Sequence, residues 1–304
     1  MTTWLLAGAS GFLGTALRVR LATEGDEVLR LVRREPAALG ERRWDPASGE
    51  LDAAVLDGVD AVVDLAGVNV FTGPWTAGRR EAILSSRVQT TSTLARALAA
   101  RGADAPVLLQ AGGVAWYGGG RTDAPHVEGD PAAPDFLAQV CVRWEGAAQE
   151  AVDAGVRVVF LRTSPVLDRS GGPFSPMRLA WSLGLGTVLG DGTQRMPLIS
   201  LADYLGVVRW AAATPHARGR YNLTVPEPCT NAEFTDALAR ALHRPRLLRA
   251  PAAVLRGALG ELSGQLLGDM WVLPKRLLDD GYVFEAPDVD ATVAAALRGA
   301  NPRV

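Results

Sequence analysis

The sequence has almost no lysine. Of 31 Lys and Arg residues in the 304-residue chain, Lys275 is the only lysine, and arginine supplies all the other basic side chains. Any catalytic arrangement that needs a lysine earlier in the chain is therefore excluded. The 33 acidic residues leave a net charge of -2, without an excess of either sign. We therefore expect neither nucleic acid nor a membrane surface as a partner.

Cysteine and long apolar runs are also scarce. Cys141 and Cys229 lie far apart and match no metal-ligand or redox spacing, so we expect a reducing compartment, no disulfide framework and no bound metal. No stretch reaches the ~20 apolar residues of a membrane-spanning helix, and the N-terminal segment has no signal-peptide pattern. We expect a globular, cytoplasmic protein; the sequence does not indicate its oligomeric state.

Short apolar runs alternate with helix-like segments through the first half of the chain. We predict helices at 12–24, 76–101 and 135–153, and strands at 3–8, 27–32, 61–67, 107–112 and 156–162. Continuous apolar strands separated by helices indicate a parallel sheet covered on both faces. After Arg162 the chain becomes glycine-rich and looks too irregular for another strand–helix–strand unit. One more strand is expected at 219–224, and Thr230 with Glu233 predicts a capped helix that ends near His243.

The first predicted strand leads directly into the glycine-rich segment GASGFLG. Its glycines have the spacing G-x-x-G-x-x-G and stand between a strand and a helix, where free backbone amides bind the pyrophosphate of a dinucleotide. In that context the alternative, a plain glycine turn, is disfavoured. The predicted cofactor contacts in this loop are Gly8, Ser10, Gly11, Phe12, Leu13 and Gly14.

The end of the second predicted strand discriminates between the two nicotinamide dinucleotides. An acidic side chain there would bind a ribose 2′-hydroxyl, whereas this chain has Arg33 and Arg34. Arginine presents a planar fork of donors that suits a phosphate, so we predict NADP (NADPH) in preference to NAD. The alternative is that both arginines are solvated surface residues.

Longer segments resemble a known family. Extended short-chain dehydrogenase/reductase proteins of the NAD(P)-dependent epimerase/dehydratase type are similar to this chain in the phosphate loop and in DLAGVNV (64–70), SSRVQTT (85–91), DFLAQVCVRWEGAA (135–148) and FLRTSPVL (160–167). The stretch at 258–287 resembles the C-terminal domain of a small subgroup called epimerase family proteins. The similarity spans nearly the whole chain.

This resemblance agrees with an α/β fold, a doubly wound parallel sheet of the Rossmann type, with a smaller and mostly helical C-terminal substrate domain. We expect an NADP-binding domain at 1–168 plus about 200–225, and a substrate-binding region at 169–199 and 226–304. The resemblance implies a small-molecule substrate, a nucleotide sugar or similar hydroxyl or carbonyl compound. It also implies cofactor contacts at Leu65, Ala66, Gly67, Arg87 and Val166.

The usual catalytic residues of the wider superfamily are missing from the corresponding positions. Typical members pair a Tyr-x-x-x-Lys helix motif with a strand-end Ser or Thr; the tyrosine is the acid/base, and the lysine lowers the pKa of that tyrosine. Here Val140, Trp144 and Gly112 stand in these places, and Lys275 lies far downstream. The superfamily mechanism is therefore excluded in its usual form.

Two side chains near these positions remain as catalytic candidates. Tyr117 follows the strand end in a loop expected to face the ligand crevice, where it would donate a proton or simply line the pocket. Cys141 is the other candidate, although buried cysteines are usually inert. The loop with His126, Glu128 and Asp130 is expected to be solvated. Two functions stay open: an NADP-dependent epimerase-like oxidoreductase, and a non-catalytic NADPH sensor or scaffold.

Overall fold

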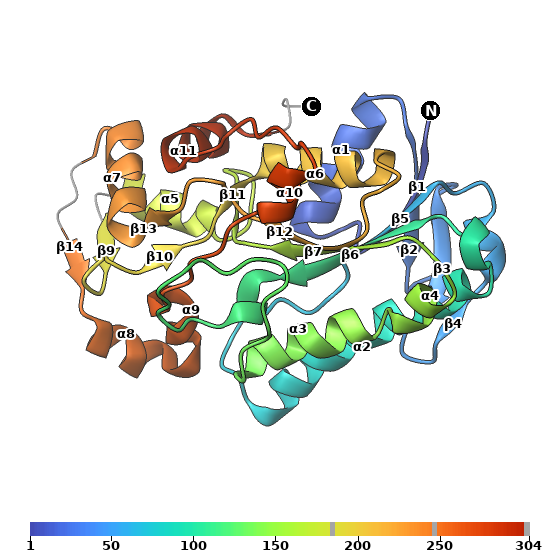
Figure 1. The fold of residues 1–304 in the computed structure, drawn as a ribbon, viewed down its shortest axis with the longest axis horizontal. Coiled ribbons are helices and arrows are strands. Elements are labelled where there is room, and N and C mark those ends of the chain that lie inside the picture. Colours follow the sequence, from blue (N-terminus) through green and yellow to red (C-terminus); the bar gives the residue numbers. More distant parts are fainter. Residues whose placement is uncertain (183–185, 245–247, 301–304) are drawn as a thin grey trace.

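An eight-stranded sheet runs through the middle of the molecule in the order β12-β7-β6-β5-β1-β2-β3-β4 (Figure 1). The computed structural model describes residues 1–182, 186–244 and 248–300. The strands of this sheet are β1 (Thr3–Ala7), β2 (Glu27–Val32), β3 (Glu41–Asp45), β4 (Glu50–Leu51), β5 (Ala61–Asp64), β6 (Val107–Gly113), β7 (Val158–Thr163) and β12 (Gly219–Leu223). All neighbours are parallel except β3 and β4, which are antiparallel.

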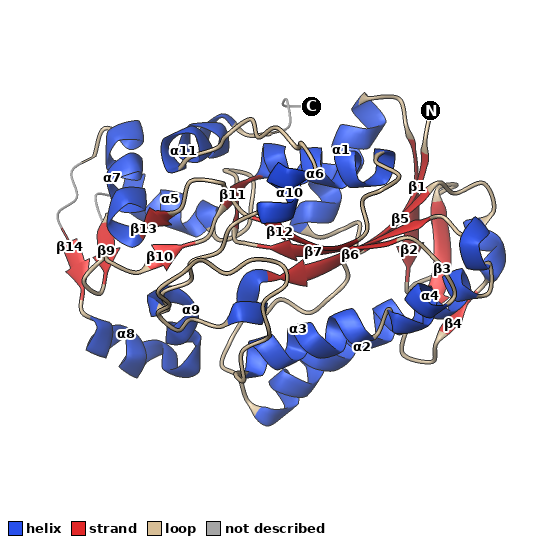
Figure 2. Cartoon of the chain, viewed as in Figure 1, coloured by secondary structure: helices blue, strands red, loops and turns tan. Residues whose placement is uncertain are grey.

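Helices cover both faces of the sheet, which explains why its central strands are apolar along their length. One face carries α1 (Phe12–Thr23) and α6 (Leu201–Ala213), and the other carries α2 (Ala77–Ala99), α3 (Phe136–Gly146) and α4 (Gln149–Asp153) (Figure 2). Successive side chains of a strand point to opposite faces. Leu6 of β1 therefore packs in the core with Leu17 of α1, whereas Leu5 packs in the core with Leu94 of α2. The predicted doubly wound parallel sheet is confirmed.

The chain after β7 forms one more strand–helix–strand unit, so the expectation that it is too irregular for one was wrong. β12 pairs in parallel with β7, from Gly219 opposite Val159 to Leu223 opposite Thr163, and α6 lies between them in the sequence. The unit was hidden because an insertion separates β7 from α6; residues 183–185 of the insertion lie outside the described ranges. The insertion contains β8 (Val166–Leu167), α5 (Phe174–Ser182), β9 (Thr187–Leu189), β10 (Arg195–Met196) and β11 (Ile199–Ser200).

β3 and β4 were not predicted because they carry almost no apolar signal. β3 reads ERRWD, and only Glu41 and Trp44 of its five residues are buried. A strand near the edge of a sheet buries few side chains, so the period-two apolar pattern that marks a strand is weak there. This omission matters, because β3 forms one wall of the pocket described below.

The rest of the chain is mostly helical, as expected. It contains β13 (Cys229–Thr230), α7 (Asn231–Leu242), β14 (Leu248–Ala250), α8 (Ala252–Leu259), α9 (Ser263–Leu267), α10 (Lys275–Asp279) and α11 (Val289–Arg298). The predicted capping box of α7 is confirmed, since Thr230 and Glu233 each bind the other's backbone amide. A third apolar core, which includes Phe174 and Phe234, joins α5, α7 and α11. The division of the chain at 168, 200 and 225 stays a prediction. Within the described ranges, no helix combines the length and apolar character needed to cross a membrane.

Candidate functional site

A pocket of about 990 Å³ lies where β1 and β5 end. From β1 the chain builds the sheet outward through β2, β3 and β4, and it then returns to place β5 on the other side of β1. In open parallel sheets, ligands bind at the carboxyl ends of the strands where the strand order reverses in this way. The segments after β1 and β5 both line the pocket, through Gly8 and Leu65 among others.

The glycines of the phosphate loop hold the start of α1 close to the sheet. A Cβ on Gly8, which has φ +78°, would lie 2.7 Å from the Leu65 carbonyl carbon, and one on Gly14 would lie 2.2 Å from the Gly8 oxygen. Gly11 is the N-cap of α1, and no side chain caps this end of the helix. The first amides of α1 are thus placed to bind an anion.

The other predicted contacts of this loop fall into three groups. Ser10 and Gly11 line the pocket, as does Gly8. Phe12 lines a second cavity of about 400 Å³, which is also lined by residues 168–171. Ser10, Gly11 and Thr15 line both cavities. Leu13 packs against the apolar core between α1 and the sheet. The loop residues therefore face two adjoining cavities.

Arginine side chains gather at the far side of the larger pocket. Arg33 and Arg34, the predicted cofactor contacts, line it, and Arg18 of α1 and Arg30 of β2 line it as well. Glu41 of β3 binds two of them: Arg34 donates to its two oxygens at 2.8 and 2.6 Å, and Arg30 Nη2 lies 3.3 Å from Oε1. The hydrogen bonds from Arg34 and from a backbone amide lower the pKa of Glu41 to about 2.

Sequence reasoning missed Glu41, Arg18 and Arg30. Glu41 lies in the unpredicted strand β3, seven residues after Arg34, and only the pairing of β3 with β2 brings the two together. The one available signal for Arg18 was its helical spacing from the glycine loop, seven residues after Gly11. The structure thus adds two cations and one anion to the predicted pair.

The residues expected after β5 lie partly on the pocket. Leu65, Ala66 and Gly67 line it. Arg87 does not; its guanidinium lies 4.9 Å from the ring centroid of Trp144 and donates to the Val68 and Ile83 carbonyls at 3.0 and 2.9 Å. Val166, expected near the nicotinamide, is buried in β8. The predicted cofactor contacts of all five residues stay predictions.

A buried acid lies directly behind this segment. Asp64, at the end of β5, accepts hydrogen bonds from the Ala66 amide at 3.1 Å, from Thr91 Oγ1 at 2.9 Å and from Gln110 Nε2 at 3.3 Å. Burial raises the pKa of Asp64 to about 6. Trp144 donates its indole N–H to Thr91 at 3.1 Å. These bonds join β5, α2, β6 and α3.

Tyr117 is enclosed, contrary to what a proton donor at a ligand crevice requires. It ends the 3-10 turn Val114–Tyr117 after β6 and is 4% exposed. Its hydroxyl donates to Asn222 Oδ1 at 2.8 Å and accepts from Arg162 Nη1 at 3.0 Å, and its ring stacks on His126. Burial raises the pKa of Tyr117 to about 12. Its catalytic role stays a prediction, while these contacts favour packing.

Cys141 is similarly enclosed. Its Sγ lies 3.6 Å from the Gly113 carbonyl oxygen, and burial raises its pKa to about 12. Gly112 precedes Gly113 at the end of β6. A Cβ on Gly112 would lie 3.4 Å from the nearest atom, the Leu161 carbonyl oxygen. The strand end thus has room for a small side chain but presents none.

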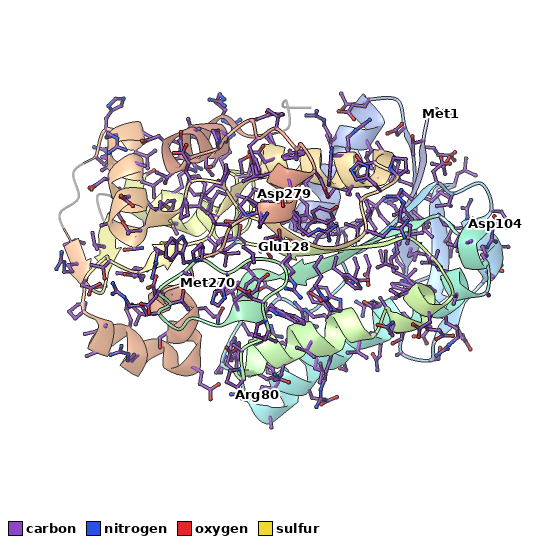
Figure 3. All side chains as sticks on the ribbon, viewed as in Figure 1. Met1, Arg80, Asp104, Glu128, Met270 and Asp279 are labelled. Carbon is purple, nitrogen blue, oxygen red and sulfur yellow. The ribbon has the colours of Figure 1, made fainter. Side chains whose placement is uncertain are left out.

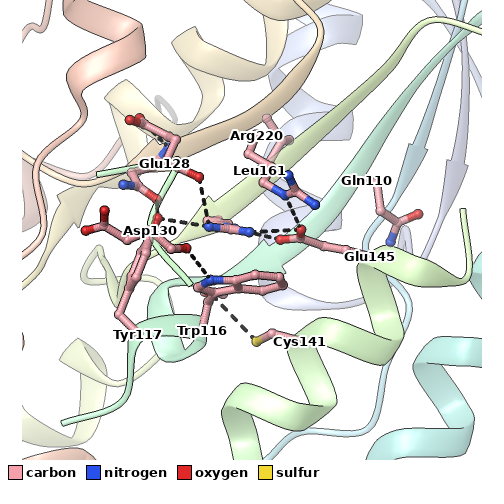
Figure 4. Close-up of polar contacts among 12 residues, drawn as sticks. Gln110, Trp116, Tyr117, Glu128, Asp130, Cys141, Glu145, Leu161 and Arg220 are labelled. Atoms are coloured by element: carbon pink, nitrogen blue, oxygen red, sulfur yellow. Dashed lines mark hydrogen bonds and ion pairs between the residues drawn. The ribbon is translucent and has the colours of Figure 1, made fainter. Parts of the chain in front are cut away.

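An ion-pair network joins α3 to the strands β7 and β12. Arg162 is fully buried and binds both oxygens of Glu145, with Nε at 2.6 Å from Oε1 and Nη2 at 3.0 Å from Oε2. Arg220 donates to the same carboxylate at 2.8 Å. The ring centroid of Trp116 lies 3.7 Å from the Arg162 guanidinium carbon. Figure 4 shows the contact between Arg220 and Glu145 as a dashed line. Glu145 of α3 therefore anchors β7 and β12.

In the loop at 126–130, which was expected to be solvated, the side chains of His126 and Asp130 are partly exposed, but Glu128 is buried. Glu128 is 5% exposed, and its Oε1 accepts from the backbone amides of Asn222 at 3.1 Å and Arg276 at 3.3 Å. Figure 3 shows Glu128 toward the middle of the molecule. The expectation was wrong for Glu128 because residues 271–273 pair with the backbone of this loop and cover it, and no local pattern reveals that contact.

Known proteins share both the sequence and the fold of this chain. The profile of the NAD dependent epimerase/dehydratase family matches residues 4–224, and that of a domain of unknown function, DUF1731, matches 250–296. An epimerase family protein of Mycobacterium bovis is 42% identical over 281 residues, which cover 92% of each chain. Human epimerase family protein SDR39U1 is 35% identical over 293 residues, covering 95% of this chain and 97% of the human protein.

Solved structures extend this similarity. Human SDR39U1 (isoform 2), solved with NADPH, has a TM-score of 0.88 and 32% identity, and the match covers 98% of this chain and 99% of that one. A nucleoside-diphosphate sugar epimerase from Corynebacterium glutamicum has a TM-score of 0.79 and 32% identity, over 97% of this chain but 58% of that one. The Bordetella bronchiseptica enzyme WbmG, solved with NAD, shares the fold at 18% identity.

Proposed function

Because the chain belongs to the NAD-dependent epimerase/dehydratase family, we propose that it binds NADP(H) and acts as an oxidoreductase on a hydroxyl or carbonyl compound. One observation carries the proposal: a glycine-rich helix start and four arginines line a single pocket at the point where the strand order reverses. The human relative solved with NADPH supports the choice of cofactor. Bound there, the nicotinamide would supply hydride transfer.

The residues present fit such a cofactor. The uncapped N-terminus of α1 suits the pyrophosphate, and the glycines let the cofactor approach the backbone closely. Arg33 and Arg34 suit the 2′-phosphate that distinguishes NADP from NAD. The 400 Å³ cavity continues from the same helix start and offers room for the second half of a dinucleotide.

For the substrate we propose a nucleotide sugar or a similar small molecule with a hydroxyl or carbonyl group. The solved Corynebacterium glutamicum relative bears the name nucleoside-diphosphate sugar epimerase and is 32% identical to this chain. The helical part beside the second cavity, with α5, α7 and α11, would close over such a substrate.

A second candidate is a non-catalytic NADPH sensor or scaffold. Tyr117 and Cys141 favour it, because burial raises the pKa of each to about 12 and neither lines either of the two cavities described above. Gly112 favours it too, since the strand end offers no hydroxyl to orient a carbonyl oxygen. Hydride transfer without a placed proton donor would be slow.

Binding and turnover measurements separate the two candidates. We expect NADPH to bind at least about tenfold more tightly than NADH, since charged hydrogen bonds to a phosphate contribute ~1.5–3 kcal/mol each. Equal affinities would contradict the NADP assignment. The oxidoreductase proposal requires that, in a broad screen, some carbonyl compound be reduced while NADPH is oxidised, or some hydroxyl compound such as a nucleotide sugar be oxidised while NADP+ is reduced. Tight NADPH binding without turnover in that screen would contradict the oxidoreductase proposal and support the non-catalytic sensor or scaffold.

A further inference from the structure

The arginines of the larger pocket differ in how their side chains are partnered. Both terminal nitrogens of Arg34 donate to Glu41, and Arg30 shares the same carboxylate. Arg18 and Arg33, in contrast, have no hydrogen bond or ion pair from their side chains to any residue in the described ranges. The pocket therefore holds two arginines that are already bound and two that are not.

Glu41 limits what the bound pair can give to a ligand. Its carboxylate is 3% exposed, and its two oxygens accept from Arg34 and from the Ala37 amide at 2.7 Å. Arg30 Nη2 forms an ion pair with the same carboxylate. One of the two positive charges is thereby neutralised. Arg34 Nη1 also donates to the Glu35 carbonyl oxygen at 2.8 Å, so while these bonds hold Arg34 can offer a phosphate only its Nε–H and the second hydrogen of Nη2. A 2′-phosphate with nearly two negative charges needs further donors.

Arg18 is placed to supply a further hydrogen-bond donor to the 2′-phosphate. Gly11, Thr15 and Arg18 are spaced four and three residues apart, so they lie on one face of α1, and all three line the pocket. At 1.5 Å per residue, Arg18 stands about 10 Å along the helix from Gly11. The Gly11 end receives the pyrophosphate, so Arg18 lies toward the adenosine end of the pocket, on the side where Arg33 and Arg34 approach.

We infer that Arg18 is a specificity-determining residue that binds the adenosine 2′-phosphate of NADP(H) together with Arg33. Glu41 holds Arg30 and Arg34 as one wall of that phosphate site. The inference rests on the proposed binding of NADP(H), and it assigns the preference for NADP to a helix residue as well as to the strand end. It predicts that loss of Arg18 weakens binding only of ligands that carry the 2′-phosphate.

Calorimetric titration with four ligands tests the inference. The ligands are NADPH, NADH, 2′,5′-ADP and 5′-AMP, of which the first and third carry a 2′-phosphate. For Arg18→Ala we expect about 10- to 100-fold weaker binding of NADPH and 2′,5′-ADP, and a change of less than about twofold for NADH and 5′-AMP. Arg18→Lys keeps the positive charge without the planar fork of donors, so it should lose less affinity for NADPH and 2′,5′-ADP than Arg18→Ala does.

Arg20→Ala is the matched control, because Arg20 lies on the same helix, pairs with Glu24 and does not line the pocket. It should leave all four affinities unchanged. Equal losses for NADPH and NADH in Arg18→Ala, or no loss at all, would overturn the role of Arg18 while leaving NADP binding intact. If the wild type itself does not prefer NADPH and 2′,5′-ADP, both the inference and the NADP assignment fail. Thermal melting of each variant identifies a loss that comes from unfolding.

Discussion

Gly11 and Gly14 stand three residues apart in the phosphate loop, yet different constraints act on them. A Cβ on Gly14 would overlap the Gly8 carbonyl, whereas the nearest atom to a Cβ on Gly11 is 3.5 Å away. Gly14 is thus required by the packing of α1 on the loop. Gly11 is compatible with a methyl group in the protein alone, and only a ligand at the helix start would exclude it.

This difference predicts separate effects for two alanine variants. Gly14→Ala should lower the free energy of unfolding by ~1–3 kcal/mol or more, because the methyl group forces α1 away from the loop. Gly11→Ala should change it by less than ~1 kcal/mol but weaken NADPH binding, since its Cβ would face the pyrophosphate. Urea unfolding and NADPH titration measure both effects. NADPH binding that is unaffected by Gly11→Ala would place the pyrophosphate elsewhere.

At the scale of elements, α3 contains neither tyrosine nor lysine and connects two strands through Glu145. That carboxylate faces Arg162 of β7 and Arg220 of β12, and Arg162 has no exposure to water. Removing one member of a buried pair leaves the other charge uncompensated, which costs more than the pair contributes.

Glu145→Gln should therefore lower the free energy of unfolding by ~3–5 kcal/mol. Glu150→Gln is the control, because Glu150 lies one helix further on, in α4, and is exposed; its effect should be below ~0.5 kcal/mol. Denaturant unfolding followed by circular dichroism measures both. A small loss for Glu145→Gln would mean that Arg162 reaches water or another acceptor when its partner is removed.

Asp64 couples β5 to α2 and β6, and it gives the fold a dependence on pH. Its folded pKa, about 6, lies above its ordinary value of 3.8, so the folded state binds more protons than the unfolded state between these values. The contribution of Asp64 to stability is therefore present at low pH and is lost as the pH rises from about 4 to 6. Asp64→Asn should flatten this part of the stability profile, measured by urea unfolding at a series of pH values. An unchanged slope would show that Asp64 does not titrate there.

At the scale of the whole molecule, sequence patterns predicted the features that depend only on residues close together in the chain. The apolar strands around β1 and β5, the glycine loop and the capping box of α7 each depend on residues close together in the chain, and the structure has them where expected. Glu41 was missed because it lies in a strand that was not predicted, although Arg34 is only seven residues away. Glu128 was expected to be solvated because its partners, the amides of Asn222 and Arg276, come from distant segments. β3 carries little apolar signal, and the segment at 271–273 covers the loop at 126–130 only through backbone pairing.

Glu128 connects the loop at 126–130 to β12 and α10. Its Oε1 accepts from the backbone amides of Asn222 in β12 and Arg276 in α10, whereas Oε2 has no partner among the described residues. Burial raises the pKa of this carboxyl, so its charge is disfavoured where it lies. The useful feature of Glu128 is therefore one acceptor oxygen rather than a negative charge.

Two substitutions separate the acceptor from the charge. Glu128→Gln keeps an oxygen for both amides and removes the buried charge, so the free energy of unfolding at neutral pH should stay within ~1 kcal/mol of the wild type or increase. Glu128→Ala leaves two buried amides without an acceptor and should cost ~1–3 kcal/mol for each. Urea unfolding of both variants measures the difference, and hydrogen exchange of the Asn222 and Arg276 amides shows where it arises. Equal losses in the two variants would mean that the charge itself, attracted to Arg276, holds the C-terminal segment in place.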